Sequence, residues 1–145
     1  MKIPRMTVIT LGVADLARAT AFYRDIFSTV PITRFEGVTF IPLPGVWLSL
    51  YTLEKLAEDI SVEVTLPATN TFRGFTLAYN ARSKEEIASI FADATAAGAH
   101  IAKAPQDTFW GGYSGYFTDP DGHYWEVAWG PMFDFSEHGD LQFKT

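Results

Sequence analysis

An acidic residue, Glu126, stands within an apolar and aromatic run near the end of the chain. The run follows Asp-Pro-Asp-Gly at residues 119–122, where the proline fixes one backbone angle and the glycine suits a positive φ. This spacing predicts a strand, a tight turn and a second strand that carries Glu126. Because an unpaired buried carboxylate is costly, Glu126 should face a cavity or have a partner. It is our candidate catalytic residue, as a general base, or else a binding group for a cationic ligand.

A purely structural role for Glu126 stays open beside the catalytic one. A buried acid that accepts a hydrogen bond from a tyrosine or a backbone amide needs no function in chemistry. A single sequence does not identify a neighbouring group that would perturb the Glu126 carboxylate. The residues alone therefore do not distinguish the structural role from the catalytic one.

Length, composition and charge limit the possible partners. The 145 residues fit one domain, 1–145, with a core of its own. The formal charge is −6 and no basic run occurs, which argues against nucleic acid and anionic membranes as partners. Cysteine is absent, which excludes disulfides and thiol chemistry. We see no signal-peptide pattern and no membrane-spanning run, so we expect a cytoplasmic protein.

The first half of the chain opens with a β-branched run, followed by an apolar stripe at helical spacing. Asp15 is the candidate N-cap of that helix, which should end before Pro31. Glycine and proline turns separate the runs that follow. The expected strands cover residues 6–13, 32–35, 38–43 and 46–52, and a short helical turn is expected over residues 53–60.

The second half repeats this order. Ser83 and Glu86 match a capping box at the start of a helix, and Gly98 is a natural helix stop. Loops are expected over residues 61–71 and 105–112. The expected strands cover residues 74–81, 100–104, 113–118 and 123–129. Each half therefore has the order βαβββ, with module one at about residues 6–60, module two at about 73–130 and a tail at 131–145.

The repeat also appears in the residues themselves. Residues 40–52 align without a gap on residues 117–129, and duplication at this length indicates two modules. The matched pairs include Phe40 with Phe117, Gly45 with Gly122, Trp47 with Tyr124, and Ser49 with Glu126.

The chain resembles the vicinal oxygen chelate superfamily, which includes glyoxalase I, bleomycin-resistance proteins and extradiol dioxygenases. The resemblance covers roughly residues 6 to 130. It rests on Ile-Thr-Leu-Gly-Val-Ala-Asp-Leu at residues 9–16 with Ala-Phe-Tyr at 21–23, and on Asp-Pro-Asp-Gly-His-Tyr-Trp-Glu at 119–126. It implies an α+β fold in which two βαβββ modules form a curled mixed sheet around a cavity, commonly in a homodimer. It does not fix the activity, because this fold hosts unrelated chemistries.

Metal-using members of that superfamily place His or Glu ligands on the first and last strands of each module. Carried over one at a time, these positions give Val8, Ser49, Thr76 (or Phe75 in the other register) and Glu126. Only Glu126 is a usual ligand, and one carboxylate does not hold a transition metal. We therefore expect no metal and no cofactor. A further interpretation is that Glu126 is only a relic of a metal-binding ancestor.

Strand alternation predicts which side chains would line a cavity. Trp47, Ser49 and Tyr51 share one face, as do Tyr124 and Glu126, and the favoured register adds Thr76 and Asn80. Aromatic walls with a few polar groups are typical of small-molecule pockets, although Trp47 and Tyr124 could equally be core residues. Trp110, in a glycine-containing loop, is the remaining candidate ligand-binding residue, either as part of a lid or as an anchor of the loop.

The tail carries four apolar side chains and is expected to pack across a homodimer, over the cavity mouth, or on its own domain. They are Met132, Phe133, Phe135 and Phe143.

These observations favour a protein that binds a small aromatic or cationic molecule in an aromatic cavity without a metal. The alternative is a lyase- or isomerase-type enzyme that uses Glu126 as acid or base, or as part of a non-standard metal site. A dimerising module without a ligand of its own is the third hypothesis.

Overall fold

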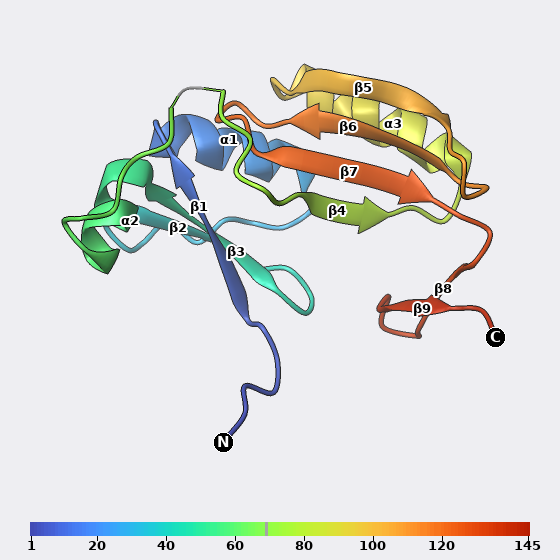
Figure 1. Cartoon of the computed structure of the whole chain (residues 1–145), viewed down its shortest axis with the longest axis horizontal. Coiled ribbons are helices and arrows are strands. Elements are labelled where there is room, and N and C mark those ends of the chain that lie inside the picture. Colours follow the sequence, from blue (N-terminus) through green and yellow to red (C-terminus); the bar gives the residue numbers. More distant parts are fainter. Residues whose placement is uncertain (69) are drawn as a thin grey trace. The chain divides into compact units, whose positions relative to one another are not determined.

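The structure is a computed structural model that describes residues 1–68 and 70–145. The chain divides into two compact units, Met1–Arg73 and Gly74–Thr145 (Figure 1). The predicted loop over residues 61–71 includes residue 69, which lies outside the described residues, and its described part contains no helix or strand. No helix in the described part of the chain combines the length and the apolar character needed to cross a bilayer.

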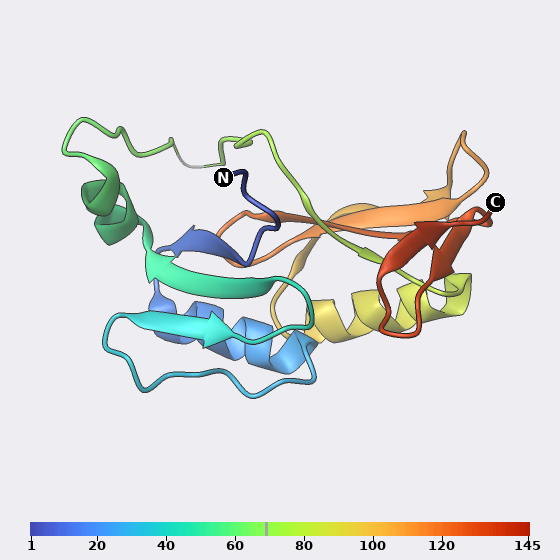
Figure 2. The ribbon, with the colours of Figure 1, turned by 90° about the horizontal axis from the view of Figure 1, so that it is seen from below.

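The first unit is a small mixed sheet covered on one face by a helix. Its central strand is β3, which pairs in parallel with β1 and antiparallel with β2. Helix α1 packs on β2 and β3 (Figure 2). The elements are β1 (Val8–Val13), α1 (Leu16–Ile26), β2 (Val38–Ile41), β3 (Trp47–Thr52) and α2 (Leu53–Ile60).

Local sequence signals explain how α1 forms and what it buries. The Asp15 carboxylate accepts a hydrogen bond from the Arg18 N–H at 3.0 Å, which confirms the predicted N-cap. The helix and the facing strands bury an apolar core. Its fully buried members include Phe22, Tyr23, Leu11, Leu50 and Ile41.

The predicted strand at residues 32–35 was wrong. Only a single bridge remains, in which Ile32 and Phe40 exchange two backbone hydrogen bonds of 2.8 and 3.1 Å. Pro31 has no N–H to extend the ladder on one side. On the other side the chain turns at Gly37, whose φ is +80°. Strand β2 likewise ends at Ile41 rather than residue 43, because Pro42 supplies no donor.

The second unit is a four-stranded mixed sheet in the order β4-β7-β6-β5. Strand β4 is parallel to β7, and the other two pairings are antiparallel. Helix α3 packs against β5, β6 and β7 on one face (Figure 2). The elements are β4 (Leu77–Asn80), α3 (Lys84–Ala96), β5 (His100–Asp107), β6 (Tyr113–Thr118) and β7 (Tyr124–Trp129).

The start of α3 differs in one detail from the predicted capping box. The Ser83 hydroxyl accepts from the Glu86 N–H at 3.2 Å, as expected. The Glu86 carboxylate, however, accepts from the Arg82 N–H at 2.7 Å and from the Tyr79 hydroxyl at 2.6 Å. This carboxylate therefore ties the end of β4 to the first turn of the helix. At the other end, Gly98 takes a φ of +109°, which confirms the predicted stop.

Strand β5 is longer than predicted and irregular. The expected loop at residues 105–112 begins only after Asp107. The register against β6 shifts twice, between Ile101 and Lys103 and between Lys103 and Gln106. Pro105 lies inside the second shift, where a bulged edge strand needs no ladder donor.

The structure confirms two modules of the same topology, with the second strand of module one reduced to a bridge. Strands β3 and β7 occupy matching positions of the sequence repeat, and the preceding turns contain Gly45 at φ +87° and Gly122 at φ +85°. The three sheets are separate in the described residues, and none closes into a barrel.

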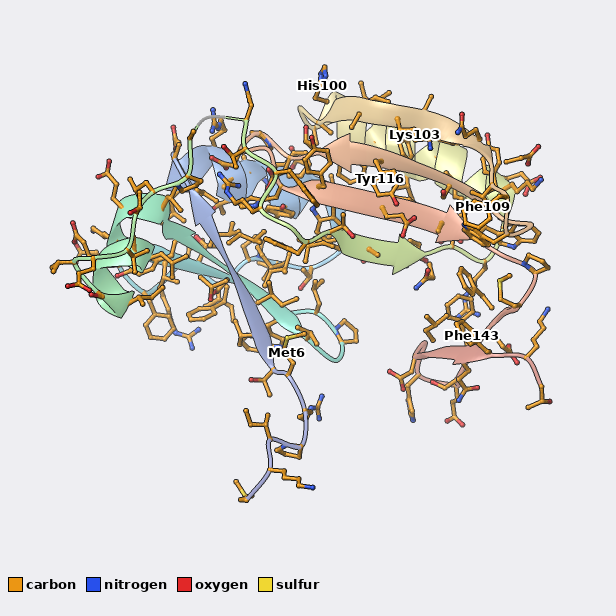
Figure 3. The ribbon with its side chains drawn as sticks, in the orientation of Figure 1. Met6, His100, Lys103, Phe109, Tyr116 and Phe143 are labelled. Carbon is orange, nitrogen blue, oxygen red and sulfur yellow. The ribbon has the colours of Figure 1, made fainter. Side chains whose placement is uncertain are left out.

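The tail forms a hairpin of β8 (Phe133–Phe135) and β9 (Leu141–Phe143). The rings of Phe133 and Phe143 stack at 6.0 Å, and Phe143 is labelled on the hairpin in Figure 3. The hairpin contacts its own unit, because Trp110 lies 6.1 Å from the Phe133 ring. A homodimer contact through this tail stays a prediction.

Candidate functional site

A row of side chains crosses all four strands of the second sheet at the level of Glu126. In register, Lys103 of β5 lies opposite Tyr116, Tyr116 lies opposite Glu126, and Glu126 lies opposite Ala78. Residues in register project from the same face of a sheet. The neighbouring positions Leu77, Phe117 and Trp125 are buried on the other face, where α3 packs. The row therefore lies on the face that α3 leaves open, and Figure 3 labels Lys103 and Tyr116 there.

Glu126 and Tyr116 form the centre of this row. The Tyr116 hydroxyl donates to Oε2 of Glu126 at 2.8 Å. This hydrogen bond, followed by burial and the negative charge of Glu126, raises the pKa of Tyr116 above its ordinary value. Tyr116 is therefore a neutral donor that fixes the carboxylate. Among the described residues, Oε1 of Glu126 has no hydrogen-bond partner and is available to a ligand or a proton.

Two further rows flank this one on the same face of the sheet, and Ser114 and Ala128 in the second of them are buried. In one row His100 lies opposite Thr118, which lies opposite Tyr124. In the other, Gln106, Ser114, Ala128 and Asn80 follow one another across the sheet. The face is thus polar, with tyrosine rings, one acid and one lysine close to its middle.

The bulges in β5 decide which of its side chains reach this face. His100 and Lys103 are separated by three positions, so a regular strand would point them to opposite faces. The extra residue at the first register shift keeps Lys103 opposite Tyr116. The same holds for Gln106, which the second shift keeps opposite Ser114.

The first unit carries the repeat counterpart of this face. Ser49 occupies the position that matches Glu126, and its hydroxyl shares a 2.5 Å hydrogen bond with the hydroxyl of Thr10. Thr10 is also its register partner on β1. The position is therefore occupied by a neutral, internally satisfied pair where the second unit has an acid.

Aromatic side chains surround that pair in the first unit. The Phe40 and Trp47 rings lie 6.2 Å apart, and Trp47 is 39% exposed. Partial burial, followed by the charge of Asp59, raises the pKa of the Tyr51 hydroxyl. The predicted binding residues Trp47, Ser49 and Tyr51 alternate with the buried Leu48 and Leu50, so the strand places them on the face away from α1.

The predicted binding residues of the second unit fall into two places. Tyr124 and Asn80 lie on the open face with Glu126, in the rows beside it. Thr76 is exposed just before β4, in the same alternation as Ala78. Trp110 lies elsewhere, packed against Gly112, Gly130 and the Phe133 ring.

The register of β4 is the one favoured from the sequence. Leu77 is buried, and the Tyr79 hydroxyl reaches Glu86 of α3, so this alternation faces the helix. Phe75, the residue of the other register, is 43% exposed and its ring lies 6.3 Å from that of His123.

Tyr116 and Lys103 are the site residues that the sequence prediction missed. A signal for Tyr116 existed, because the turn at 119–122 makes Thr118 face Tyr124 and therefore Tyr116 face Glu126. No comparable signal existed for Lys103, whose position depends on the bulge.

The residues at the predicted ligand positions do not fit a transition-metal site. Val8 lies opposite Trp47, while the register partners of Ser49 and Glu126 are Thr10 and Ala78. None of these partners offers imidazole or carboxylate. Over residues 1–68 and 70–145, no group of three or more His, Cys, Asp or Glu side chains is placed to hold a metal ion.

Solved structures share this architecture. A glyoxalase-related enzyme from Fulvimarina pelagi superposes with a TM-score of 0.86 at 31% identity, covering 99% of this chain and 100% of that one. The fosfomycin resistance protein FosX from Listeria monocytogenes gives a TM-score of 0.66 at 25% identity, covering 90% of this chain and 97% of that one.

Among curated proteins, the metallothiol transferase FosB of Shouchella clausii (strain KSM-K16) is 27% identical over 133 residues, which are 90% of this chain and 83% of that protein. The sequence model of one superfamily matches residues 5–127. Because that match spans both modules, the chain belongs to the Glyoxalase/Bleomycin resistance protein/Dioxygenase superfamily.

Proposed function

We propose that this protein binds a small organic molecule on the open face of its second sheet, at Glu126, without a resident metal. The observation that carries the proposal is the Glu126 carboxylate itself. Tyr116 holds one of its oxygens at 2.8 Å, and the other has no partner in the described part of the chain. A partly buried acid fixed in this way is prepared to receive a donor or a cation from a ligand.

The surroundings of Glu126 favour an aromatic or cationic ligand. Tyr116 and Tyr124 provide ring surface beside the carboxylate, and rings attract cations as well as flat molecules. The exposed Lys103 lies beyond Tyr116 in the same row, so a cationic group would bind nearer to Glu126 than to β5.

The remaining expectations from the sequence belong to the same proposal. We place the protein in the cytoplasm as a homodimer, with Thr76, Asn80 and Tyr124 as contributors to ligand binding beside Glu126. Ligand contacts of Trp47, Ser49, Tyr51 and Trp110 stay predictions from the sequence.

An enzymatic function is the second candidate, with Glu126 as general acid or base in a lyase- or isomerase-type reaction. It is favoured by the oriented carboxylate with its unpartnered oxygen, since a general base must be held within reach of the proton it takes. Relatives with enzyme names, such as the metallothiol transferase FosB, support it as well. On this proposal the reaction proceeds through side chains of the open face.

Titration with candidate ligands tests the binding proposal. Tryptophan fluorescence is followed while aromatic antibiotics, glutathione adducts and catechols are added to the purified protein. We expect saturable quenching by at least one planar or cationic compound. Glu126→Gln should weaken that binding while leaving the melting temperature close to that of the native protein. Equal binding by native protein and Glu126→Gln would contradict the assignment of the site.

Turnover separates the two candidates. If bound compounds emerge unchanged after prolonged incubation, sequestration is supported. If a compound is converted by the native protein and Glu126→Gln loses this conversion while retaining binding, the enzymatic candidate replaces it.

A further inference from the structure

A pocket of about 310 Å³ lies within the second unit, between the edge strand β4 and the β8–β9 hairpin. Its volume is at the lower end of the roughly 300–1,000 Å³ usual for small-molecule sites. Glu126 is not part of its lining, so the pocket differs from the centre of the proposed site, although Ala78 and Asn80 of strand β4 belong to both. The side chains and backbone that form it come chiefly from Tyr79, Asn80, Arg82, Phe135, Gly139 and Leu141.

Arg82 supplies the charge of this pocket. Its guanidinium lies over the Phe135 ring, 4.4 Å from the ring centre. Its backbone N–H donates to Glu86 at 2.7 Å, which anchors the residue at the start of α3. Among the described residues, no carboxylate lies within ion-pair distance of the guanidinium. The ring holds one face of this planar group, and the N–H donors along its edge are available to an anion.

The other walls suit the body of an organic molecule. Leu141 and Phe135 are apolar, and the Tyr79 hydroxyl is bound to Glu86, so that its ring forms the wall. Gly139, at φ +88°, has no side chain and leaves the hairpin turn open beside the pocket. Asn80 adds an amide that can donate to an oxygen of the ligand.

The nearby charges limit the ligand to a single negative charge. One guanidinium faces the pocket, whereas the Glu86 carboxylate lies behind Tyr79 and Asp140 follows Gly139 in the hairpin turn. A doubly charged phosphate would be repelled more strongly by these acids than a monoanion. A carboxylate also matches the two-pronged geometry of an arginine edge.

We propose that this pocket binds a small organic monocarboxylate, with its carboxylate paired to Arg82 and its apolar body against Phe135 and Leu141. This site shares Asn80 with the function proposed for Glu126 but does not require the Glu126 carboxylate. It would make the C-terminal hairpin part of a binding site as well as a cover for the sheet edge.

Titration of the ¹⁵N-labelled full chain with benzoate tests the proposal. We expect saturable shifts in the amide signals of Asn80, Gly139 and Leu141. Benzamide, the neutral analogue of the same shape, should bind at least about tenfold more weakly, because it lacks the charge-assisted pair. Inorganic phosphate should compete poorly. Equal binding of benzamide, or full competition by phosphate at equal concentration, would overturn the proposal.

Three variants locate the binding. Arg82→Gln should weaken benzoate binding about tenfold or more, and Phe135→Leu should give a smaller loss, because it keeps an apolar wall but removes the ring under the guanidinium. Arg24→Gln, which changes an exposed arginine of the first unit that is paired with Asp25 at 3.1 Å, should bind as the native chain does. Native-like amide spectra show that each variant is folded.

The result for Glu126→Gln keeps the two proposals apart. If this variant binds benzoate within about twofold of the native affinity, the pocket stands whatever the open face binds. If Arg82→Gln binds normally and Glu126→Gln does not, the anion site is lost and the binding belongs to the open face.

Discussion

The Tyr116 hydroxyl donates to Oε2 of Glu126 at 2.8 Å across the antiparallel pair β6–β7. The two residues are direct register partners, so the bond follows from strand pairing rather than from a flexible loop. A carboxylate held by a rigid sheet loses little freedom when a ligand arrives, which lowers the entropic cost of binding.

Tyr116→Phe should reduce both stability and ligand affinity. Loss of this part-buried hydrogen bond is expected to lower the free energy of unfolding by about 1 kcal/mol. Ligand binding at Glu126 should weaken severalfold, because the carboxylate is no longer oriented. Urea unfolding and fluorescence titration measure the two effects. Tyr113→Phe is the matched control, since Tyr113 lies in the same strand with its ring near Lys84. Equal changes in both variants would show that the Glu126 contact has no special role.

Purified protein should contain no stoichiometric transition metal. The register partners of Glu126 and Ser49 are Ala78 and Thr10, which leaves one strong donor. Elemental analysis after extensive dialysis is the measurement, and treatment with a chelator should leave the melting temperature unchanged. About one Ni, Zn, Fe or Mn per chain would contradict the proposal of a metal-free site.

Stability should fall as the pH rises through the titration range of Tyr79. Burial, followed by the hydrogen bond to Glu86, raises the pKa of Tyr79 from 10.0 to about 12. The folded state thus holds this proton more tightly than the unfolded state does, so its contribution is complete below pH 10 and is lost toward pH 12. Urea midpoints at pH 9, 10 and 11 should decline more steeply for the native chain than for Tyr79→Phe. Parallel declines would show that Tyr79 does not contribute.

Gly115→Ala should destabilise the second unit by about 1–3 kcal/mol. A methyl group at this position would lie 2.7 Å from the Phe91 ring, 2.8 Å from the Lys103 carbonyl oxygen and 2.9 Å from the Pro105 nitrogen. Two of these three atoms belong to the backbone and cannot move aside cheaply. Chemical denaturation gives the change in stability. Gly45→Ala, at a site with open space but a φ of +87°, separates backbone strain from crowding.

The elements that depend on local sequence could be predicted well. Asp15 and Ser83 are N-caps as expected, because a cap requires only neighbours within one turn. The repeat located β3 and β7, because Gly45 and Gly122 stand at matched positions before these strands and both adopt a positive φ.

Features that depend on distant contacts were not predictable in this way. Alternation supports a strand at residues 32–35, but the proline before it and the turn after it leave a single bridge. From the sequence alone Pro105 is typical of a loop, but the bulge accommodates it within strand β5. The pocket beside Arg82 requires Phe135 to return to it from the tail, and no local pattern encodes that contact.

The two register shifts in β5 leave this strand with additional residues relative to β6. Each shift absorbs an additional residue and returns the following side chain to the open face. Strand β5 could therefore lose Ala102 and keep Lys103 opposite Tyr116. A deletion within the regular strands β6 or β7 would instead move every later side chain of the strand to the other face of the sheet. Strand β5, at the outer edge of the site, can thus change in length during evolution while the strands that carry Tyr116 and Glu126 stay in register.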